Sequence, residues 1–440
     1  MSGTAGLVAS IIIAILAIII MFVCILRFPK LRIGKFSIDT FWIPTFVGAF
    51  LLIIIIKDVG KTFIDSITTN NSLNPLKILV LFISVSFLSV TLDDSGFFSF
   101  IASLFVSKYH NSQIKLFLVL YVLISILTIF TSNDIVILTF TPFIIFLSKK
   151  GNINPIPYLV MEFAAANTYS MMIEIGNPTN VYLSGVYEIP FLDYFLKMAI
   201  PSILCGLASL LVLLLIFRKD LKKEIEVFQM NVSPLRDKKL CIVSGSILLL
   251  ATITLAISNY INIEMYIVAV IYASVLLLFL IIYSIYKQNI NVILNPIKRI
   301  PYNLIPFVLS MFAIIIALES FNLFGMLGNA IESIGNEKVT AIIYLIVSIL
   351  SCNIVNNIPM TLAFSSVLGA NASLTSIYAV IMGSNIGALL TPIGALAGIM
   401  WLRILKETHI KYSFFDFIKN GFFVTLTIIG VAIISILILL

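Results

Sequence analysis

Long apolar runs separated by short polar segments occupy this sequence from end to end. A helix needs about 20 apolar residues to cross the hydrocarbon core of a bilayer, or about 17 to 25 when it tilts. Uninterrupted runs of this kind span residues 7–26, 40–56, 76–92, 195–217, 240–258, 262–286, 303–320 and 414–440. We therefore predict a simple transmembrane helix for each of these runs.

Two further regions pair apolar arms across a polar tip. The first has arms 114–130 and 135–147, joined by Thr-Ser-Asn-Asp. The second has arms 340–350 and 358–368, joined by Cys-Asn-Ile-Val-Asn-Asn. Each is predicted to be a re-entrant hairpin that enters the membrane and turns back.

Two other apolar regions are interrupted midway. Residues 156–186 contain Gly-Asn-Pro-Thr-Asn at 176–180, and residues 374–404 contain Thr-Pro-Ile-Gly at 391–394. Irregular backbone at membrane depth is tolerated only where protein buries it or where it lines a cavity. The two hairpins and the two broken helices together therefore predict one shared cavity.

Composition supports a membrane protein and excludes several other classes. Of 440 residues, 60% are hydrophobic and only 11% are charged, whereas soluble domains carry about 25% charged residues. Soluble enzymes, nucleic-acid binders and disordered scaffolds are therefore excluded. The chain has two histidines, no paired cysteine spacing and no phosphate-binding loop, so we predict no metal, no cofactor and no enzymatic activity.

The basic residues predict the orientation of the chain. Cytoplasmic loops are enriched in Lys and Arg, so the favoured topology gathers these residues on one side. With re-entrant hairpins and an external N-terminus, 22 of the 27 Lys and Arg fall on the cytoplasmic side. The exceptions are Lys57, Lys61, Lys77, Lys197 and Lys338. We therefore predict a multi-pass plasma-membrane protein with both termini outside and no nucleic-acid partner, the net charge of +7 being an orientation signal.

The chain divides into two halves of matching order. Residues 1–217 and 240–440 each contain three spans, a hairpin, a broken helix and a final span, and the charged cytoplasmic loop 218–239 joins them. Five crossings per half invert the second half relative to the first. The pairs Asn167–Gly176 and Asn385–Gly394 recur at an offset of 218, and the hairpin tips recur at an offset of 223. The predicted fold class is an all-α polytopic membrane protein with two inverted repeats, each of five spans (one broken) and a re-entrant hairpin.

Polar residues at the four breaks are candidates for substrate binding. Inverted-repeat transporters bind their substrate near the midplane, where helix N-termini offer N–H groups and partial positive charge. Asn, Ser and Thr can also simply cap helix ends, and this alternative stays open for each single residue. Recurrence in both halves favours a solute site for the set as a whole. The predicted substrate-binding residues are Thr131, Ser132, Asn133, Asn177, Thr179, Asn180, Asn356, Asn357, Ser384, Asn385 and Thr391. The predicted helix-break residues are Gly176, Pro178, Pro359, Gly383, Pro392 and Gly394.

Acidic residues within the membrane are candidates for ion coupling, because an ionisable group in hydrocarbon is expensive and usually functional. Asp134 lies at the first hairpin tip, and Glu174 lies two residues before Gly176 in the first broken helix. Both are predicted to carry the coupling proton or cation. For Glu174 a hydrogen bond to the broken backbone is the alternative. Glu162 is left unassigned.

At these residues the sequence resembles the arsenite/antimonite permease family of the larger ion transporter superfamily. The resemblance is clearest in LDDSGFF (92–98), SNDIVILTFTPFIIFL (132–147), DYFLKMAIPSILCGLASLLVLLLIFRKDL (193–221), IVNNIPMTLAF (354–364) and GSNIGALLTPIGALAGIMWLRIL (383–405). By contrast, EIGNPTN (174–180) resembles the broader superfamily, which includes sodium/proton antiporters and anion permeases. The paired Ser-Asn-Thr motifs of the sodium–dicarboxylate branch are absent.

The resemblance implies proton-coupled efflux of arsenite or antimonite, in some members with a cytosolic arsenite ATPase as partner. The alternatives are a sodium- or proton-coupled carrier of citrate- or dicarboxylate-like anions, and a sodium/proton antiporter. The implied ligands are a small oxyanion or metalloid solute and a coupling proton or sodium ion, and the lipid bilayer surrounds the chain. A homodimer is left open. Only Cys352 lies at a proposed site, so capture of arsenic by three thiolates is disfavoured and we expect recognition by hydrogen bonds.

Overall fold

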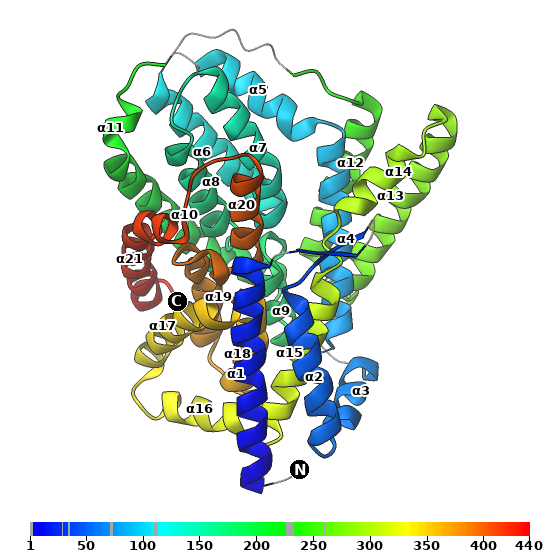
Figure 1. Ribbon diagram of the computed structural model, residues 1–440, viewed down its shortest axis with the longest axis vertical. Coiled ribbons are helices and arrows are strands. Elements are labelled where there is room, and N and C mark those ends of the chain that lie inside the picture. The colour runs from blue at the N-terminus through cyan, green and yellow to red at the C-terminus, as the bar shows by residue number, and fades with distance from the viewer. Residues whose placement is uncertain are drawn as a thin grey trace.

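The chain folds almost entirely into helices, shown in a computed structural model that describes residues 3–28, 30–33, 36–70, 74–109, 112–225, 233–258 and 260–440 (Figure 1). One antiparallel hairpin departs from the predicted all-α class: β1 (Lys30–Ile33) pairs with β2 (Phe36–Asp39). Both segments alternate polar and apolar residues, which is the strand pattern. Of the two histidines, His110 lies outside the described residues, as does Glu226 of the predicted loop 218–239.

The helices of the first half contain the predicted spans, the first hairpin and the first broken helix. Two short helices that the sequence did not predict, α3 and α5, follow α2 and α4. The elements are α1 (Gly3–Arg27), α2 (Trp42–Ile55), α3 (Val59–Thr68), α4 (Pro75–Asp94), α5 (Phe97–Tyr109), α6 (Gln113–Phe130), α7 (Asn133–Lys150), α8 (Ile156–Tyr169), the 3-10 turn η1 (Glu174–Gly176), α9 (Pro178–Val186) and α10 (Phe191–Ile216).

The second half repeats this order after the short helix α11 (Arg218–Leu221) of the connecting loop. Its short helices α14 and α16 correspond to α3 and α5. The elements are α12 (Lys238–Ile257), α13 (Met265–Lys287), α14 (Asn291–Arg299), α15 (Leu304–Glu319), α16 (Leu323–Glu332), α17 (Glu337–Val355), α18 (Asn357–Leu368), α19 (Leu374–Ile386), η2 (Gly387–Leu389), η3 (Pro392–Gly394), α20 (Leu396–Glu407) and α21 (Phe414–Ile438).

The two broken helices match position by position. Helix α19 begins 218 positions after α8, η3 begins 218 positions after η1, and α20 begins 218 positions after α9. This is the offset at which Asn167 and Asn385 recur in the sequence. The correspondence of α1–α10 with α12–α21 therefore extends to the local backbone of the breaks.

The fold is that of a polytopic membrane protein. Within the described ranges, nine helices are long and apolar enough to cross a membrane, or up to ten if α2 and α3, which are bent by 115° at their junction, form one span. Each predicted simple span coincides with one of these helices or with the bent pair. Helices α6 and α17, predicted as hairpin arms, are also among the nine.

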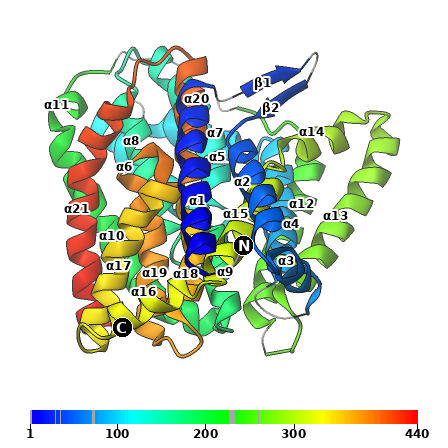
Figure 2. The same cartoon turned by 60° about the horizontal axis from the view of Figure 1, so that its bottom comes forward.

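The helices pack in two groups. Helix α4 packs on α12 and α13, and α15 packs on α1 and α2. We call this first group of helices, to which both halves contribute, the frame. Helices α6 and α10 pack on α8, α17 packs on α19, and α10 packs on α21, which forms a second bundle. Figure 2 shows α12 and α13 at the right and α10 and α21 at the left. Where α4 and α15 meet α7, α9 and α18, the two groups face each other.

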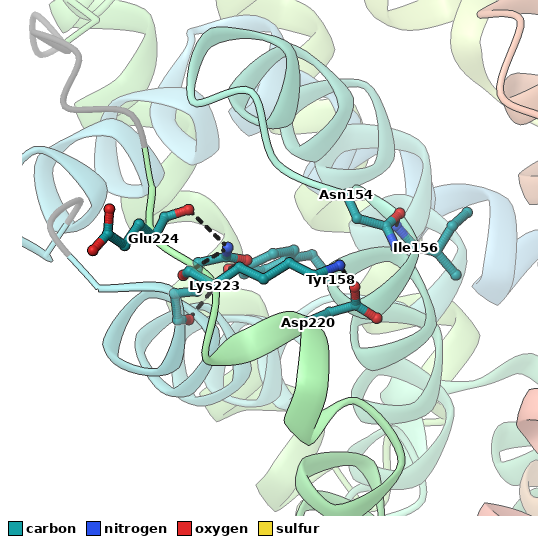
Figure 3. Close-up of polar contacts among 7 residues, drawn as sticks. Asn154, Ile156, Tyr158, Asp220, Lys223 and Glu224 are labelled. Carbon is teal, nitrogen blue, oxygen red and sulfur yellow. Dashed lines mark hydrogen bonds and ion pairs between the residues drawn. The ribbon is translucent and has the colours of Figure 1, made fainter.

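The beginning of the connecting loop is anchored to the second bundle. Gln113 at the start of α6 donates from Nε2 to the carbonyl oxygens of Lys223 and Glu224, at 3.1 and 3.4 Å. Tyr158 of α8 in turn donates its hydroxyl to the backbone and side-chain oxygens of Gln113, both at 3.2 Å (Figure 3). The loop therefore leaves the first half at a fixed point beside α6 and α8.

The end of the loop is anchored to the turn between α4 and α5. The N–H groups of Arg236 and Asp237 donate to the Ser95 carbonyl oxygen at 3.0 and 3.2 Å. Asp237 caps α12 by accepting from the Leu240 N–H at 3.0 Å, and it also accepts from the Tyr283 hydroxyl. Partial burial raises the pKa of Asp237, but these hydrogen bonds outweigh that effect and hold the pKa below its usual range.

Candidate functional site

The first broken helix is shaped by a glycine and an asparagine cap. A Cβ added at Gly176 would overlap the carbonyl oxygen of Ser170, so only glycine allows the chain to fold back here. Asn177 then caps α9 by accepting from the Thr179 N–H at 3.2 Å. Pro178 occupies the first position of α9, where its missing N–H costs nothing.

The second broken helix has a different start. A Cβ added at Gly394 would lie 2.6 Å from the Gly387 carbonyl oxygen, so this fold-back also requires glycine. Ala395 occupies the cap position of α20 and offers no side-chain acceptor. The N-terminal N–H groups of α20 therefore lack the side-chain acceptor that Asn177 provides for α9.

Buried polar side chains join the two broken helices across the halves. Asn385 accepts at Oδ1 from the Ser170 hydroxyl and from Asn177 Nδ2, both at 2.9 Å. Its Nδ2 donates to Asn180 Oδ1 at 2.8 Å and to the Ile381 carbonyl oxygen at 2.9 Å. The hydroxyls of Thr179 and Ser384 also lie 3.0 Å apart. We call this set of hydrogen-bonded residues the amide cluster. Its members are Ser170, Asn177, Thr179, Asn180, Ser384 and Asn385.

The amide cluster is satisfied internally. Asn180 Nδ2 donates to the carbonyl oxygens of Ser170 and Ile173, and Ser384 donates to the Ile381 carbonyl oxygen. Five of the predicted substrate-binding residues belong to this cluster, and each already has protein partners. The arrangement favours a joint between the two broken helices at these positions, and it leaves the hairpin tips as the better candidates for contact with solute.

The first hairpin tip combines satisfied amides with two groups that lack partners. Asn133 donates from Nδ2 to Asn167 Oδ1 at 3.1 Å, and Thr131 donates to a carbonyl oxygen of α6. The Ser132 hydroxyl is buried and has no hydrogen-bond partner among the described residues. Within the described part of the chain, no hydrogen bond or ion pair involves the half-buried carboxylate of Asp134.

The second hairpin tip is tied to the second break. Asn356 has a positive φ of 76° and donates from Nδ2 to the Ile393 carbonyl oxygen at 2.8 Å. Asn353 accepts from the Thr391 hydroxyl at 2.6 Å and donates to the Gly387 carbonyl oxygen at 3.0 Å. Asn357 is buried at the start of α18. Asn353 was not among the predicted site residues, although it lies one helical turn before the Asn-Asn pair.

A cavity of about 590 Å³ reaches the first hairpin tip. We call it the main cavity. Residues of α4 and α15 line it together with Asp134 and Ile135 of α7 and Pro392 and Ile393 of η3. Its lining continues along α20 from Leu396 to Lys406, a distance of about 15 Å at 1.5 Å per residue. The main cavity therefore extends from the hairpin tip to the far end of α20.

The far end of the main cavity is basic. Its lining includes Lys298 and Arg299 of α14, Arg403 and Lys406 of α20, and Lys411. Arg299 pairs with Asp93 of α4, and Arg403 pairs with Asp39 and Glu407. No ion pair is formed by the three lysines within the described residues. Because Lys406 and Lys411 are exposed, this end reaches the surface.

The corresponding region of the other half is nearly closed. Between α9, α18, α4 and α15 there is a space of only about 30 Å³, lined by Thr179, Tyr182 and Thr361 among others. Tyr182 also lines a separate pocket of about 400 Å³, and its hydroxyl lies 3.1 Å from Ser365 Oγ. Tyr187 donates to the carbonyl oxygens of Ser365 and Gly369. We call the two contact regions between the frame and the second bundle the seams. The seam that contains the main cavity is open to the first hairpin tip, and the seam at Tyr182 is closed.

The structure separates the two predicted coupling acids. Glu174 is fully buried in η1, and neither of its carboxylate oxygens has a hydrogen-bond partner in the part of the chain that the structure describes. It does not line the main cavity, whereas Asp134 does. Of the two, Asp134 is the acid that a solute in the main cavity could contact.

Two of the predicted helix-break residues lie within helices. Gly383 is inside α19, where an added Cβ would overlap the Ser348 hydroxyl of α17, so this glycine permits close packing of two helices. Pro359 lies in the first turn of α18, a position that proline tolerates because no intrahelical N–H bond is lost. Gly176, Pro178, Pro392 and Gly394 do lie at the breaks.

Comparison with known proteins places this architecture in a class. Over 366 residues the chain is 25% identical to an arsenical pump membrane protein of Escherichia coli, covering 80% of this chain and 83% of the relative. It is 25% identical over 407 residues to a putative arsenical pump membrane protein of Bacillus subtilis, covering 86% and 90%. The crystal structure of the YdaH transporter of Alcanivorax borkumensis matches 98% of this chain and 97% of that chain, with a TM-score of 0.54 and 11% identity, which is a likeness of fold.

The fold and these relatives define a secondary transporter of the ion transporter superfamily rather than an enzyme. The model of the CitMHS family, described as citrate transporter, matches residues 4–379. The chain belongs to this family, and it is a multi-pass membrane protein.

Proposed function

We propose that this protein exports arsenite or antimonite from the cell in exchange for protons. The observation that carries the proposal is the inner end of the main cavity. There the unpaired carboxylate of Asp134 lies beside a hairpin tip of neutral amides and hydroxyls, and the basic residues lie toward the far end of α20.

The chemistry of this end suits a neutral solute with several hydroxyl groups. Arsenite is a neutral trihydroxide at neutral pH, and in the main cavity it can exchange hydrogen bonds with Asp134 and with backbone N–H groups at the start of α20. A carboxylate at the same place repels a polyanion but can bind a proton. The relatives named arsenical pump membrane proteins support the same solute.

In the proposed transport cycle, a solute site between two inverted repeats opens alternately to the two sides of the membrane. The support comes from the matching order of α1–α10 and α12–α21 and from the constant offset of 218 at the broken helices. With α6–α7 and α17–α18 as re-entrant hairpins, both termini lie outside, and the five basic residues of the main cavity belong to the cytoplasmic side. In this orientation the main cavity of the structure opens to the cytoplasm.

An anion carrier is the second candidate, and the basic end of the main cavity favours it. Lys298, Lys406 and Lys411 have no ion-pair partner in the described part of the chain, and a positive entrance attracts anions. The family description as citrate transporter points the same way.

Uptake into everted membrane vesicles separates the two candidates. With an imposed proton gradient, acidic inside, vesicles containing the protein should accumulate arsenite, and labelled citrate should be neither accumulated nor able to compete. Vesicles without the protein serve as the control. Citrate uptake driven by an inward proton or sodium gradient, without arsenite uptake under the acidic-inside gradient, would replace the proposal by the anion carrier.

A further inference from the structure

Glu162 is a fully buried acid that the proposed transport site does not use. It lies in α8 at 0% exposure, and its carboxyl group faces the Thr141 hydroxyl of α7. The indole N–H of Trp401 from α20 is close to the same carboxyl but does not meet hydrogen-bond geometry. Glu162 therefore lies where α7, α8 and α20 meet.

In the described ranges no Lys, Arg or His forms an ion pair with Glu162, although helix α8 packs against six elements, α6, α7, α10, α19, η2 and α21. An isolated ionised carboxylate without water or a cation is among the most expensive groups to bury. A bound proton removes that cost.

The hydrogen bonds of the Thr141 hydroxyl indicate independently that the Glu162 carboxyl is protonated. Its hydroxyl oxygen is 2.6 Å from the Ile137 carbonyl oxygen and 3.0 and 3.1 Å from the two carboxyl oxygens of Glu162. The hydroxyl has one hydrogen, and a carbonyl oxygen can only accept, so the shortest contact uses that hydrogen. The contact with Glu162 then needs a hydrogen from the carboxyl group.

We propose that Glu162 is a proton-binding site and that its proton fastens α8 to α7 through a hydrogen bond to Thr141. Helices α7 and α20 are both walls of the main cavity, and Asp134 lies two helical turns before Thr141 on α7. Protonated Glu162 is thus a positioning residue that holds the α7 wall in place. The proposal stands whichever solute is transported.

The correspondence between halves shows that this site is not part of the repeat. The position 218 residues after Glu162 is Val380 of α19, which is fully buried and apolar. At the matching place in the second half, an apolar valine is therefore enough to pack the helix. The carboxylic acid in the first half needs a separate explanation, and the proton-mediated contact supplies it.

Infrared spectroscopy of the full-length protein in lipid tests the protonation state directly. A protonated carboxylic acid has a carbonyl stretch in a region where carboxylates do not absorb. The difference spectrum between the unaltered protein and Glu162→Gln should show one such band from mildly acidic to mildly alkaline pH. A difference spectrum containing carboxylate bands instead would overturn the proposal.

A pair of threonine variants tests the hydrogen bond without altering the acid. Thr141→Val removes the acceptor, so the Glu162 band should move to higher frequency and the melting temperature should fall. Thr139→Val is the matched control, because the Thr139 hydroxyl on the same helix has no hydrogen-bond partner within the described ranges. Equal spectra and melting temperatures for the two variants would contradict the proposed bond.

Transport measurements test the positioning role. Glu162→Ala removes the contact between α8 and Thr141 of α7 and should lower transport, whereas Glu162→Gln supplies an amide donor to Thr141 and should restore most of it. An alanine variant with unaltered transport would overturn the positioning role. So would a glutamine variant that folds to the same melting temperature yet transports no better than the alanine variant.

Discussion

The two halves of this transporter share their backbone plan but differ in where they carry charge. Helices α8 and α19, and the breaks that follow them, correspond at a constant offset of 218 positions. The acids Asp134, Glu162 and Glu174 of the first hairpin and first broken helix nevertheless have no acidic counterparts in the second half. The matching residues are Asn357 for Asp134, Val380 for Glu162 and Pro392 for Glu174. The two halves therefore share a backbone plan, whereas these three ionisable groups belong to the first half alone.

The seams between frame and bundle show a second difference. Tyr182 of α9 closes one seam by contacting Ser365, and its counterpart 218 positions later is Met400, which lines the open main cavity. A tyrosine brings a hydroxyl that can fasten a seam, and methionine brings only flexible apolar volume. The two seams therefore carry different side chains at matched backbone positions.

Replacing the acid at the inner end of the main cavity should have the largest effect on function. If coupling depends on the first half alone, Asp134→Asn should reduce proton-driven transport about 100-fold or more, because the amide keeps the shape but cannot release a proton. Transport driven by a proton gradient in vesicles measures this loss.

The matching substitution in the second half provides the control for that experiment. Asn357→Asp combined with Asp134→Asn restores the number of carboxylates but places the new one at the other hairpin. We expect no recovery of proton-driven transport. Full activity of the double variant would show that the halves are interchangeable in coupling.

Glycine-to-alanine substitutions at the two breaks should show what the halves share. Gly176→Ala places a methyl group on the Ser170 carbonyl oxygen, and we expect a loss of about 4 kcal/mol of unfolding free energy or a failure to fold. Gly394→Ala should be similarly damaging. Gly185→Ala in α9, where the added methyl group meets open space, is the control and should be neutral. Thermal unfolding in detergent gives the comparison, and a tolerated Gly176→Ala would contradict the constraint.

Much of the fold could be predicted because its signals are local. The length of an apolar run determines whether a helix can span the membrane, and Gly-Asn-Pro or Thr-Pro-Ile-Gly within such a run marks a break. The short helices α3, α5, α14 and α16 were missed because each is too short to show a spanning signal. The β1–β2 hairpin was missed because its strands have only four residues each.

The burial of most candidate polar residues was predictable, but their pairings were not. The sequence indicated Asn, Ser and Thr at the hairpin tips and breaks, and all of the predicted substrate-binding residues except Thr391 are buried. That Asn385 bonds to Asn177 and Asn180, more than 200 positions away, depends on how two broken helices cross. The basic end of the main cavity joins α14 to α20 in the same non-local way. Spacing along a chain cannot supply such contacts.

Removing the centre of the amide cluster should destabilise the joint between the halves by an intermediate amount. Asn385→Ala leaves the Nδ2 donor of Asn177 and the Oδ1 acceptor of Asn180 unpaired in a buried place, which should cost about 2–3 kcal/mol. Asn353→Ala, a change at a half-buried amide bonded within the second half, should cost less. Thermal unfolding measures both, and the reverse order would show that the joint between halves is not centred on Asn385.

The smallest expected effect concerns the closed seam. Tyr182→Phe removes one hydroxyl contact at 3.1 Å, which is worth about 1 kcal/mol, so the open form of this seam should become about fivefold more populated.

Thr361→Cys places a thiol in the small space behind Tyr182, and its labelling rate by a water-soluble maleimide reports opening. The same chain without Thr361→Cys corrects for native cysteines. Tyr344→Phe, which loses only a 3.5 Å contact to a backbone carbonyl, is the matched control. Faster labelling with Tyr182→Phe but not with Tyr344→Phe would identify the tyrosine as the fastening of the closed seam, whereas equal rates would assign closure to apolar packing alone.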